Sequence, residues 1–279
     1  MGLKDILAVI DATSGGDHVL RFAAQLTEQR SGQLSGLVVG WQPSVPAISE
    51  SWAAAGQIEK LAKEMQAVLD ADIKTAKMRL ERELGTSRVE GLLMEVEDAR
   101  KVVGIRARHA DVTIVSRLRP AAADAVNVVL EACLFDSGRP VIVVPPAWKS
   151  RKIGRNVLAV WKPTREAARA FADAGPILET ADRVVVATVD AVPSDFGYGG
   201  SPGADICAHL ARTGAKVELV NLASGGRSVT ETMLDQALAI DADLLVMGGY
   251  GRPRISELIL GGVTREMLHI SPLPILMSH

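Results

Sequence analysis

Residue types that build metal centres and disulfide frameworks are scarce in this sequence. Cysteine occurs only as Cys133 and Cys207, both inside apolar helical patterns, so their spacing indicates neither a disulfide framework nor a zinc site. The 5 histidines are scattered without the spacing of metal ligands. We therefore expect no metal site, and two isolated thiols suit a reducing cytoplasm.

An excess of charge of one sign and long hydrophobic runs are also missing. The chain carries 31 Lys and Arg against 33 Asp and Glu, a formal net charge of -2, which favours neither nucleic acid nor an anionic membrane. The apolar run near the start of the sequence ends at Asp11 and is too short for a signal peptide or a membrane span. We expect a cytoplasmic protein that binds neither nucleic acid nor membranes.

What the sequence does contain is a regular alternation of short apolar runs with longer segments of helical period. This alternation is typical of βαβ units and a mostly parallel sheet, so the predicted fold class is α/β. Strands are predicted near 5–10, 33–40, 89–95, 112–116, 140–144, 156–161, 182–189, 216–221, 243–248 and 274–277. Helices are predicted at 16–30, 54–84, 98–108, 123–136 and 203–213, the second with an apolar face of Ile58, Leu61, Met65, Leu69, Ile73, Ala76 and Leu80.

The order of elements occurs twice along the chain. KDILAVIDAT at 4–13 matches RNVLAVWKPT at 155–164, and HADVTIVS at 109–116 matches DADLLVMG at 241–248. We infer two copies of one βαβαβαβαβ domain, at 1–147 and 155–279, joined by a basic linker. The basic residues of that linker form either a solvated surface or a small anion-binding patch.

The stretch GGYGRPRISELILGGVTREML at 248–268 follows the fourth strand of the second copy. Gly248 and Gly251 therefore occupy the crevice at the carboxyl end of a parallel strand, where open α/β sheets bind ligands. Arg252 follows them and could contact a phosphate.

The glycine pair Gly261 and Gly262 breaks this stretch into a loop and a helix. Two adjacent glycines inside one helix would cost about 2 kcal/mol relative to alanine, so we predict a new helix starting at Val263. The free N–H groups of Gly262, Val263 and Thr264 would then form an anion site at the positive end of the helix dipole.

With these residues in place, the sequence resembles the universal stress proteins. GGYGRPRISELILGGVT is similar to their nucleotide-binding signature, GxxG, nine residues, then G followed by Ser or Thr, with Gly248, Gly251 and Gly261 in register. ILAVIDAT and VLAVWKPT resemble the first strand of that family, and the duplication resembles its tandem members. The resemblance implies two adenine-nucleotide-hydrolase-like domains, each an open sheet of five parallel strands in the order 3-2-1-4-5 flanked by helices.

The resemblance also implies a ligand and a mode of association. ATP, with any Mg²⁺ that accompanies it, would lie at the strand-four loop, and the backbone near Val189 would meet the adenine. Association would use the fifth strands, either in a homodimer or in pairing of the two domains within the chain. On this reading the protein is a stress-response regulatory or protective protein, with at most a weak ATPase activity and no assigned catalytic residue.

Two positions of the second copy depart from the family pattern. Gly262 stands where a Ser or Thr hydroxyl would contact phosphate, and Lys162 stands where the family has an Asp at the end of strand one. The exchange of a carboxylate for an ammonium reverses the local charge and could favour a triphosphate, a different ligand or no ligand. The first copy keeps Asp11 but has no glycine between Val112 and Ser137, so the second copy holds the candidate site.

Two alternatives remain open. The chain could be a ligand-free interaction module in which the glycine pair only permits close helix packing. It could also be an ATP pyrophosphatase acting at Ser14 to Asp17, although a capping box with Ser14 as N-cap explains the same letters. Phe196 and Tyr198 could close over an adenine, or their loop could serve no ligand, and Trp161 is expected to be a packing residue.

Overall fold

In a computed structural model the chain forms two compact units. The N-terminal unit is Leu3–Ser137 and the C-terminal unit is Gly138–His279, with which Gly2 is grouped. The structure describes residues 2–12, 16–42, 52–84, 88–117, 125–149, 153–195, 199–249 and 262–279. Each unit is an open, mainly parallel sheet flanked by helices, as the alternation of apolar runs predicts.

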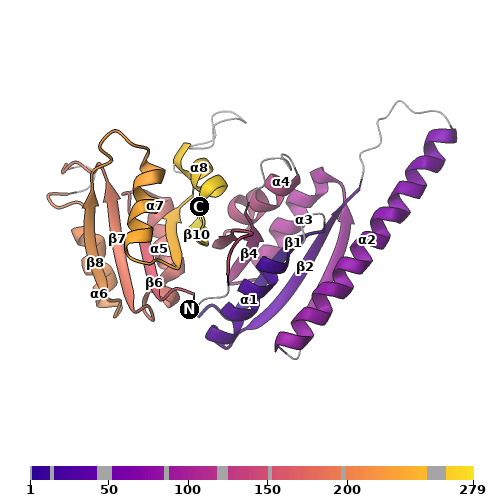
Figure 1. The fold of residues 1–279 in the computed structure, drawn as a ribbon, viewed down its shortest axis with the longest axis horizontal. Helices are drawn as coiled ribbons and strands as arrows, with labels where there is room; N and C mark the ends of the chain where they lie inside the picture. Colours follow the sequence, from indigo (N-terminus) through magenta and orange to yellow (C-terminus); the bar gives the residue numbers. More distant parts are fainter. Residues whose placement is uncertain are drawn as a thin grey trace. The chain divides into compact units, whose positions relative to one another are not determined.

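The N-terminal unit contains four parallel strands in the order β3-β2-β1-β4 (Figure 1, indigo to magenta). Its elements are β1 (Asp5–Asp11), α1 (Asp17–Arg30), β2 (Gln33–Trp41), α2 (Trp52–Leu84), β3 (Arg88–Met94), α3 (Val96–Arg108), β4 (Val112–Ser116), α4 (Ala125–Glu131) and the π-helical turn η1 (Ala132–Asp136). β1 is buried along almost its whole length because strands flank it on both sides and helices cover its faces. It is therefore the centre of this core.

The helices of this unit pack in two pairs. α1 contacts α2, while α3 contacts α4 and η1. Right-handed crossovers place the two pairs on opposite faces, because the chain moves outward from β1 to β3 and then returns to β4. The predicted apolar face of α2 is buried only in part: Leu69, Ala76 and Leu80 are buried, whereas Leu61 is exposed.

The C-terminal unit contains six strands in the order β8-β7-β6-β9-β10-β5 (Figure 1). Its elements are β5 (Val141–Val144), β6 (Asn156–Val160), α5 (Arg165–Leu178), β7 (Arg183–Val189), α6 (Ala204–Arg212), β8 (Val217–Leu222), α7 (Val229–Ala239), β9 (Leu244–Gly248), α8 (Gly262–Ile270) and β10 (Ile275–Ser278). The strands of the second repeat, β8-β7-β6-β9-β10, follow the predicted order 3-2-1-4-5 and are parallel.

The fifth strands of the two repeats pair with each other. β5 runs antiparallel to β10, with Ile142 opposite Leu276. Both strands are entirely buried, so their apolar edges cover each other within the chain. β5 belongs to the first repeat of the sequence, yet it lies in the C-terminal unit. The domain limits at 147 and 155 are a proposal from the sequence.

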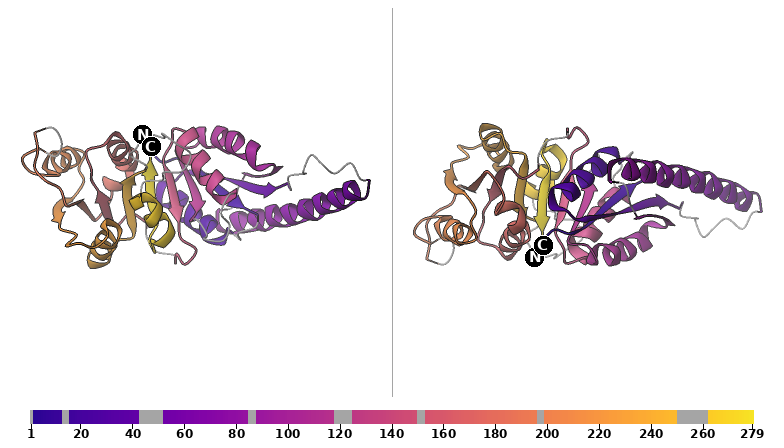
Figure 2. Two further views of the ribbon diagram at one scale, coloured as in Figure 1. Left: turned by 90° about the horizontal axis from the view of Figure 1, so that it is seen from above. Right: turned by 90° about the horizontal axis from the view of Figure 1, so that it is seen from below.

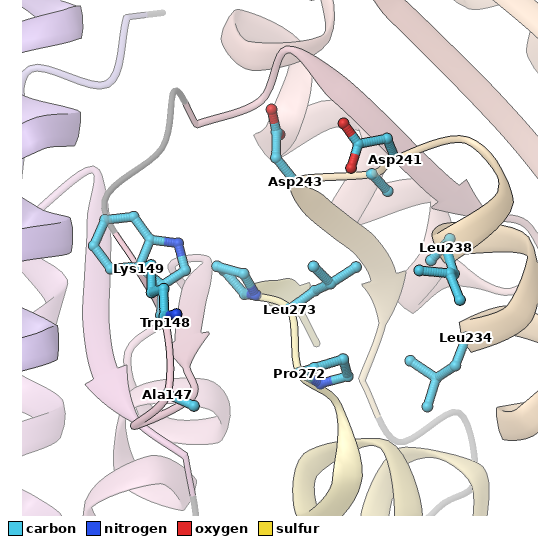
Figure 3. Close-up of a pocket in the computed structure, with 12 residues that line it drawn as sticks. Ala147, Trp148, Lys149, Leu234, Leu238, Asp241, Asp243, Pro272 and Leu273 are labelled. Carbon is cyan, nitrogen blue, oxygen red and sulfur yellow. The ribbon is translucent and has the colours of Figure 1, made fainter.

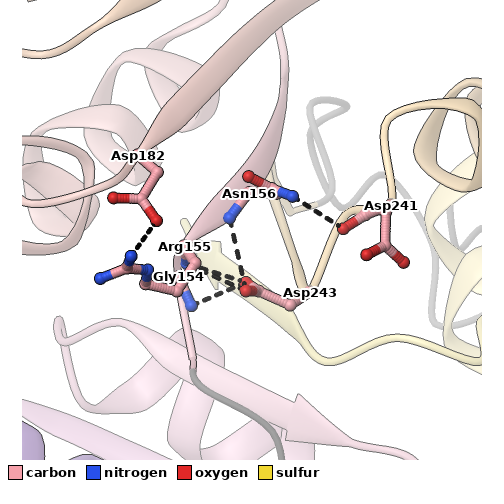
Figure 4. A network of polar contacts seen from close by, with 6 residues as sticks. All are labelled: Gly154, Arg155, Asn156, Asp182, Asp241 and Asp243. Carbon is pink, nitrogen blue, oxygen red and sulfur yellow. Dashed lines mark hydrogen bonds and ion pairs between the residues drawn. The ribbon is translucent and has the colours of Figure 1, made fainter.

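A half-buried aspartate ties the start of the first strand to the start of the fourth strand in each repeat. In the C-terminal unit the Asp243 carboxylate accepts hydrogen bonds from the N–H groups of Gly154, Arg155 and Asn156 at 2.7 to 3.3 Å (Figure 4). In the N-terminal unit Asp111, which the repeat match sets opposite Asp243, accepts hydrogen bonds from the N–H groups of Lys4 at 2.8 Å and Asp5 at 3.0 Å. Burial raises the pKa of Asp243, and the three backbone N–H groups oppose that rise.

Candidate functional site

The strand register brings three of the predicted ligand residues to one edge of the C-terminal sheet. Val160 of β6 pairs with Ala187 of β7 and with Met247 of β9. Lys162 and Val189 follow two residues beyond these pairs, and Gly248 follows Met247 directly. This edge is the topological switch point of the sheet, because the chain leaves β6 toward β7 and returns from the other side as β9.

Helix α8 begins at the same edge. It connects β9 to the parallel strand β10, so it must start where β9 ends and run back to where β10 begins. Its first residue is Gly262, one residue before the predicted start at Val263. Gly262 is exposed, and among the described residues nothing lies within 4 Å of where its Cβ would be. The N–H groups of its first turn, including that of the buried Thr264, belong to a helix start that no described residue covers at Gly262.

The remaining predicted ligand residues lie outside the described residues. These are Gly251, Arg252 and Gly261, which fall between Gly249 and Gly262. Phe196 and Tyr198 also fall in such a gap. Their proposed roles stay predictions.

Gly248 has a structural reason to be glycine. A Cβ at this position would stand 2.5 Å from the backbone nitrogen of Ala167 and 2.8 Å from the carbonyl carbon of Glu166. The sequence predicted that another backbone segment would approach Gly248 closely. Within the described chain that segment is the first turn of α5. The glycine is therefore explained by helix packing without any ligand.

The first turn of α5 carries its own carboxylate. Thr164 caps the helix by accepting a hydrogen bond from the Ala167 N–H at 3.3 Å, and Glu166 is only 4% exposed. The Arg165 Nε donates to Glu166 Oε1 at 2.6 Å. Burial raises the pKa of Glu166, but hydrogen bonds from Arg165, from its own N–H and from Thr164 outweigh that rise, so the pKa is lowered overall. This carboxylate disfavours a phosphate at α5 and leaves α8 as the better anion site.

Trp161, just after β6, packs as expected. Its ring lies edge-on against Phe171 of α5, with 5.2 Å between ring centroids and 60° between the planes. The contact places the ring under α5, which is the behaviour of a core residue. Lys162 is the next residue, and it is exposed.

At the equivalent edge of the N-terminal unit, described side chains contact one another. His18 is 4% exposed, and its Nε2 lies 2.9 Å from the hydroxyl of Ser116 at the end of β4. Asp11 is 7% exposed and accepts a hydrogen bond from Trp41 Nε1 at 3.2 Å. No sequence pattern predicted the contact of His18 with Ser116, although the repeat match sets Ser116 opposite Gly248.

The capping box predicted for α1 is wrong. The helix begins at Asp17 with Gly16 as its N-cap, and no side chain caps it. Asp17 instead forms an ion pair with Arg79 of α2 at 2.5 Å. Ser14 lies outside the described residues.

A cavity of about 370 Å³ lies at the opposite edge of the C-terminal sheet (Figure 3). Trp148, Leu234, Leu238, Asp241 and Leu273 are among its lining residues. Asp243 and Pro274, which also line it, directly precede β9 and β10, so the cavity is at the amino ends of the strands. It is separate from the predicted nucleotide site, and the sequence did not predict it.

The described ranges contain neither a cluster of metal ligands nor a membrane-spanning helix. There, no three His, Cys, Asp or Glu side chains are grouped in a way that could hold a metal ion. In the same ranges no helix combines the length and the hydrophobicity needed to cross a membrane.

Residues 155–279 match the sequence pattern of the universal stress protein family. Residues 155–279 therefore form a universal stress protein domain. The matched segment contains the strand ends and the start of α8 described above. None of the curated proteins compared with the chain matches its sequence.

Solved universal stress proteins share the fold of the whole chain. One from Archaeoglobus fulgidus is 16% identical with a TM-score of 0.64, covering 97% of this chain and 97% of its own. A putative universal stress protein from Pseudomonas aeruginosa is 15% identical with a TM-score of 0.56, covering 98% of this chain and 92% of its own. Both comparisons extend over the two repeats, so the N-terminal repeat shares the fold of the universal stress protein domain.

Proposed function

We propose that the C-terminal unit binds an adenine nucleotide, with the phosphates at the start of α8. The observation that carries the proposal is the meeting of Lys162, Gly248 and an open helix N-terminus at the switch point of one sheet. An open N-terminus offers unpaired N–H groups and positive potential, and the Lys162 ammonium adds a full charge at the same edge. These are the groups that an anionic ligand requires.

The residues take different parts in this proposal. Gly262, Val263 and Thr264 donate backbone N–H groups, and Lys162 supplies the charge that favours phosphate. The backbone at Val189 meets the base, while Gly251, Arg252 and Gly261 complete the phosphate loop. Any Mg²⁺ arrives with the nucleotide, and no residue is assigned to catalysis.

We further propose that only the C-terminal unit holds the ligand. In the N-terminal unit the pair of His18 and Ser116 occupies the equivalent edge. The protein then acts as a cytoplasmic stress-response protein that senses or holds one nucleotide per chain. At most a slow ATPase activity accompanies binding.

The test is calorimetric titration with ATP, ADP and AMP in low salt. Binding should weaken by about tenfold or more in Lys162→Ala, because one charge next to a phosphate contributes about 1.5 kcal/mol or more. Lys216→Ala is the matched control, since Lys216 is an exposed lysine just before β8, at the other end of the strands. Absence of binding heat with all three nucleotides, or equal weakening by both variants, would sink the proposal.

A ligand-free interaction module of the same fold is the second candidate. The close contact between Gly248 and α5 favours it, because that contact removes one reason to invoke a ligand. Under this alternative, substitutions at Gly262 change no nucleotide-dependent property. An ATP pyrophosphatase acting at Ser14 to Asp17 is a third candidate and would release pyrophosphate, but Asp17 is already paired with Arg79.

A further inference from the structure

The amino-terminal half of α2 extends beyond the body of the N-terminal unit. In Figures 1 and 2 the helix continues past the ends of the neighbouring strands. The first buried side chain along it is Leu69, and none of the described side chains from 56 to 68 is buried. This segment is called the α2 arm below.

The α2 arm makes its recorded polar contacts only with itself and with the next turn of its own helix. In the described chain these are Lys63 with Glu59 at 2.7 Å, Lys60 with Glu64 at 3.8 Å, and Gln66 with Asp70 at 2.9 Å. An isolated helix of about this length is marginal in water. These polar contacts add nothing from the body that carries the arm, and Ile58 and Met65 are only half-buried, so packing against a further partner would stabilise the arm.

Apolar side chains form a stripe along the arm. Ile58, Leu61, Met65 and Val68 are spaced by three, four and three residues, which is the a and d pattern of a coiled coil. Leu61 is 43% exposed and Val68 is 54% exposed. A helix that only projects into solvent has no physical reason for such a stripe.

We propose that the α2 arm packs antiparallel against the α2 arm of a second copy of this chain. The stripe is complementary to itself in that orientation, because antiparallel helices place each a residue opposite a d residue. A two-fold axis near Lys63 sets Ile58 opposite Val68 and Leu61 opposite Met65. Each pair occurs twice, so every side chain of the stripe finds a partner.

The charges of the arm permit this pairing. Glu59, Lys60, Lys63 and Glu64 sum to zero, and each of them already faces an opposite charge one turn away. Two arms therefore meet without net repulsion. Ala62 flanks the stripe between Leu61 and Met65, and its small side chain lets the two helices approach closely.

Two features favour a second copy of this chain over another occupant. The fifth strands, which the family resemblance links to association, already pair with each other as β5 and β10 and leave no free edge between them. The antiparallel orientation places the two bodies at opposite ends of a contact about 20 Å long. A parallel pair would bring both bodies to the same end.

The association should be weak and dependent on concentration. An ordinary stable interface uses about 20 to 30 residues from each partner, and the arm offers fewer. Sedimentation velocity over a hundredfold range of concentration, up to high micromolar, should show the average mass rising from monomer toward dimer. A wild-type chain that stays monomeric over this range would overturn the proposal.

Two variants separate the stripe from the rest of the arm. Leu61→Glu places a charge in the stripe and should weaken association by about tenfold or more, and the exposure of Leu61 means that the fold itself should persist. Ala67→Glu adds the same charge at an exposed position off the stripe and should associate like the wild type. Equal behaviour of the two variants would contradict the proposal.

Cysteine cross-linking tests the orientation. In a Cys207→Ser background, the double variant Ile58→Cys with Val68→Cys should form disulfide-linked dimers under mild oxidation, because residues 58 and 68 of different copies face each other. The remaining Cys133 is fully buried, and burial raises the pKa of its thiol far above the usual range, so it does not compete. Ile58→Cys alone should not cross-link, and efficient cross-linking by this single variant would show a parallel pair and overturn the proposal.

Discussion

Gly248 lies so close to Ala167 that a Cβ on Gly248 would stand 2.5 Å from the backbone nitrogen of Ala167. The contact joins the end of β9 to the first turn of α5, which are the two walls of the candidate site. A side chain at Gly248 would therefore disturb both the packing of α5 on β9 and the shape of the crevice. The first two predictions separate these effects.

Gly248→Ala should destabilise the protein by about 1 to 3 kcal/mol, because rigid backbone must move to admit the methyl group. Urea unfolding measures the change. Gly56→Ala is the control: Gly56 lies in α2 with nothing within 4 Å of the added Cβ among the described residues, and alanine should stabilise the helix by up to about 1 kcal/mol. Equal stability of Gly248→Ala and the wild type would show that β9 and α5 are not in close contact in solution.

Gly262→Asp should abolish nucleotide binding and leave the fold intact. An acidic residue in the first turn suits the helix dipole, so the free energy of unfolding should stay equal or rise by a few tenths of a kcal/mol. The same carboxylate would repel a phosphate at the start of α8. Gly262→Ala adds only a methyl group, with no described atom within 4 Å of it, and should keep most of the binding. If Gly262→Asp binds nucleotide like the wild type, the phosphates do not lie at α8.

Asp243→Ala should cost about 2 to 3 kcal/mol in the free energy of unfolding. The substitution removes the acceptor for the N–H groups of Gly154, Arg155 and Asn156, and charged hydrogen bonds to backbone are among the stronger ones. Asp182→Ala breaks only the ion pair with Arg155, in which both side chains are 47% exposed, and should cost less than about 1 kcal/mol. A ranking in the opposite order would contradict the role given to Asp243.

Glu166→Gln should reduce stability near neutral pH, and the difference from the wild type should shrink in acid. The pKa of Glu166 is lowered in the fold, so the ionised form stabilises the protein above the usual Glu value of about 4.3. That stabilisation is lost as the pH falls through the lowered value. Unfolding curves at a series of pH values measure the difference.

Glu97→Gln is the matched control for this pH series. Glu97 is the second residue of α3, as Glu166 is of α5, but it is exposed. Its substitution should change stability little at any pH. A constant difference between Glu166→Gln and the wild type down to strongly acidic pH would mean that ionisation of Glu166 does not stabilise the fold.

Local pattern was enough to predict the strands. The β-branched runs became strands within a residue or two of their expected limits. The order 3-2-1-4-5 was implied by the resemblance to the universal stress proteins, and the second sheet has it. The glycine pair correctly predicted that a helix begins there, because glycine cost is a property of the backbone itself. Gly251, Arg252 and Gly261 fall outside the described residues, and their role is still a prediction.

Other features could not be predicted because they depend on which segments meet in space. The apolar period of α2 predicted one continuous buried face, but the body of the unit reaches only as far as Leu69. The spacing SGGD suggested a capping box, but α1 begins at Asp17, which pairs with Arg79 more than sixty positions away in sequence. The contact of His18 with Ser116 likewise joins residues that only the sheet brings together.

By itself the sequence determined that this chain is two α/β repeats, with one candidate phosphate site in the second. Strand and helix periods, glycine cost and repeated motifs are local, and they can be read without coordinates. Only the tertiary structure decided that His18 contacts Ser116 at the edge of the first sheet and that the first turn of α5 packs directly against Gly248. It also decided that the amino-terminal half of α2 extends beyond its unit. These outcomes depend on packing between segments that are distant in sequence. The space and the hydrogen-bond partners available to a side chain are set by its neighbours in the fold, and the local sequence does not identify those neighbours.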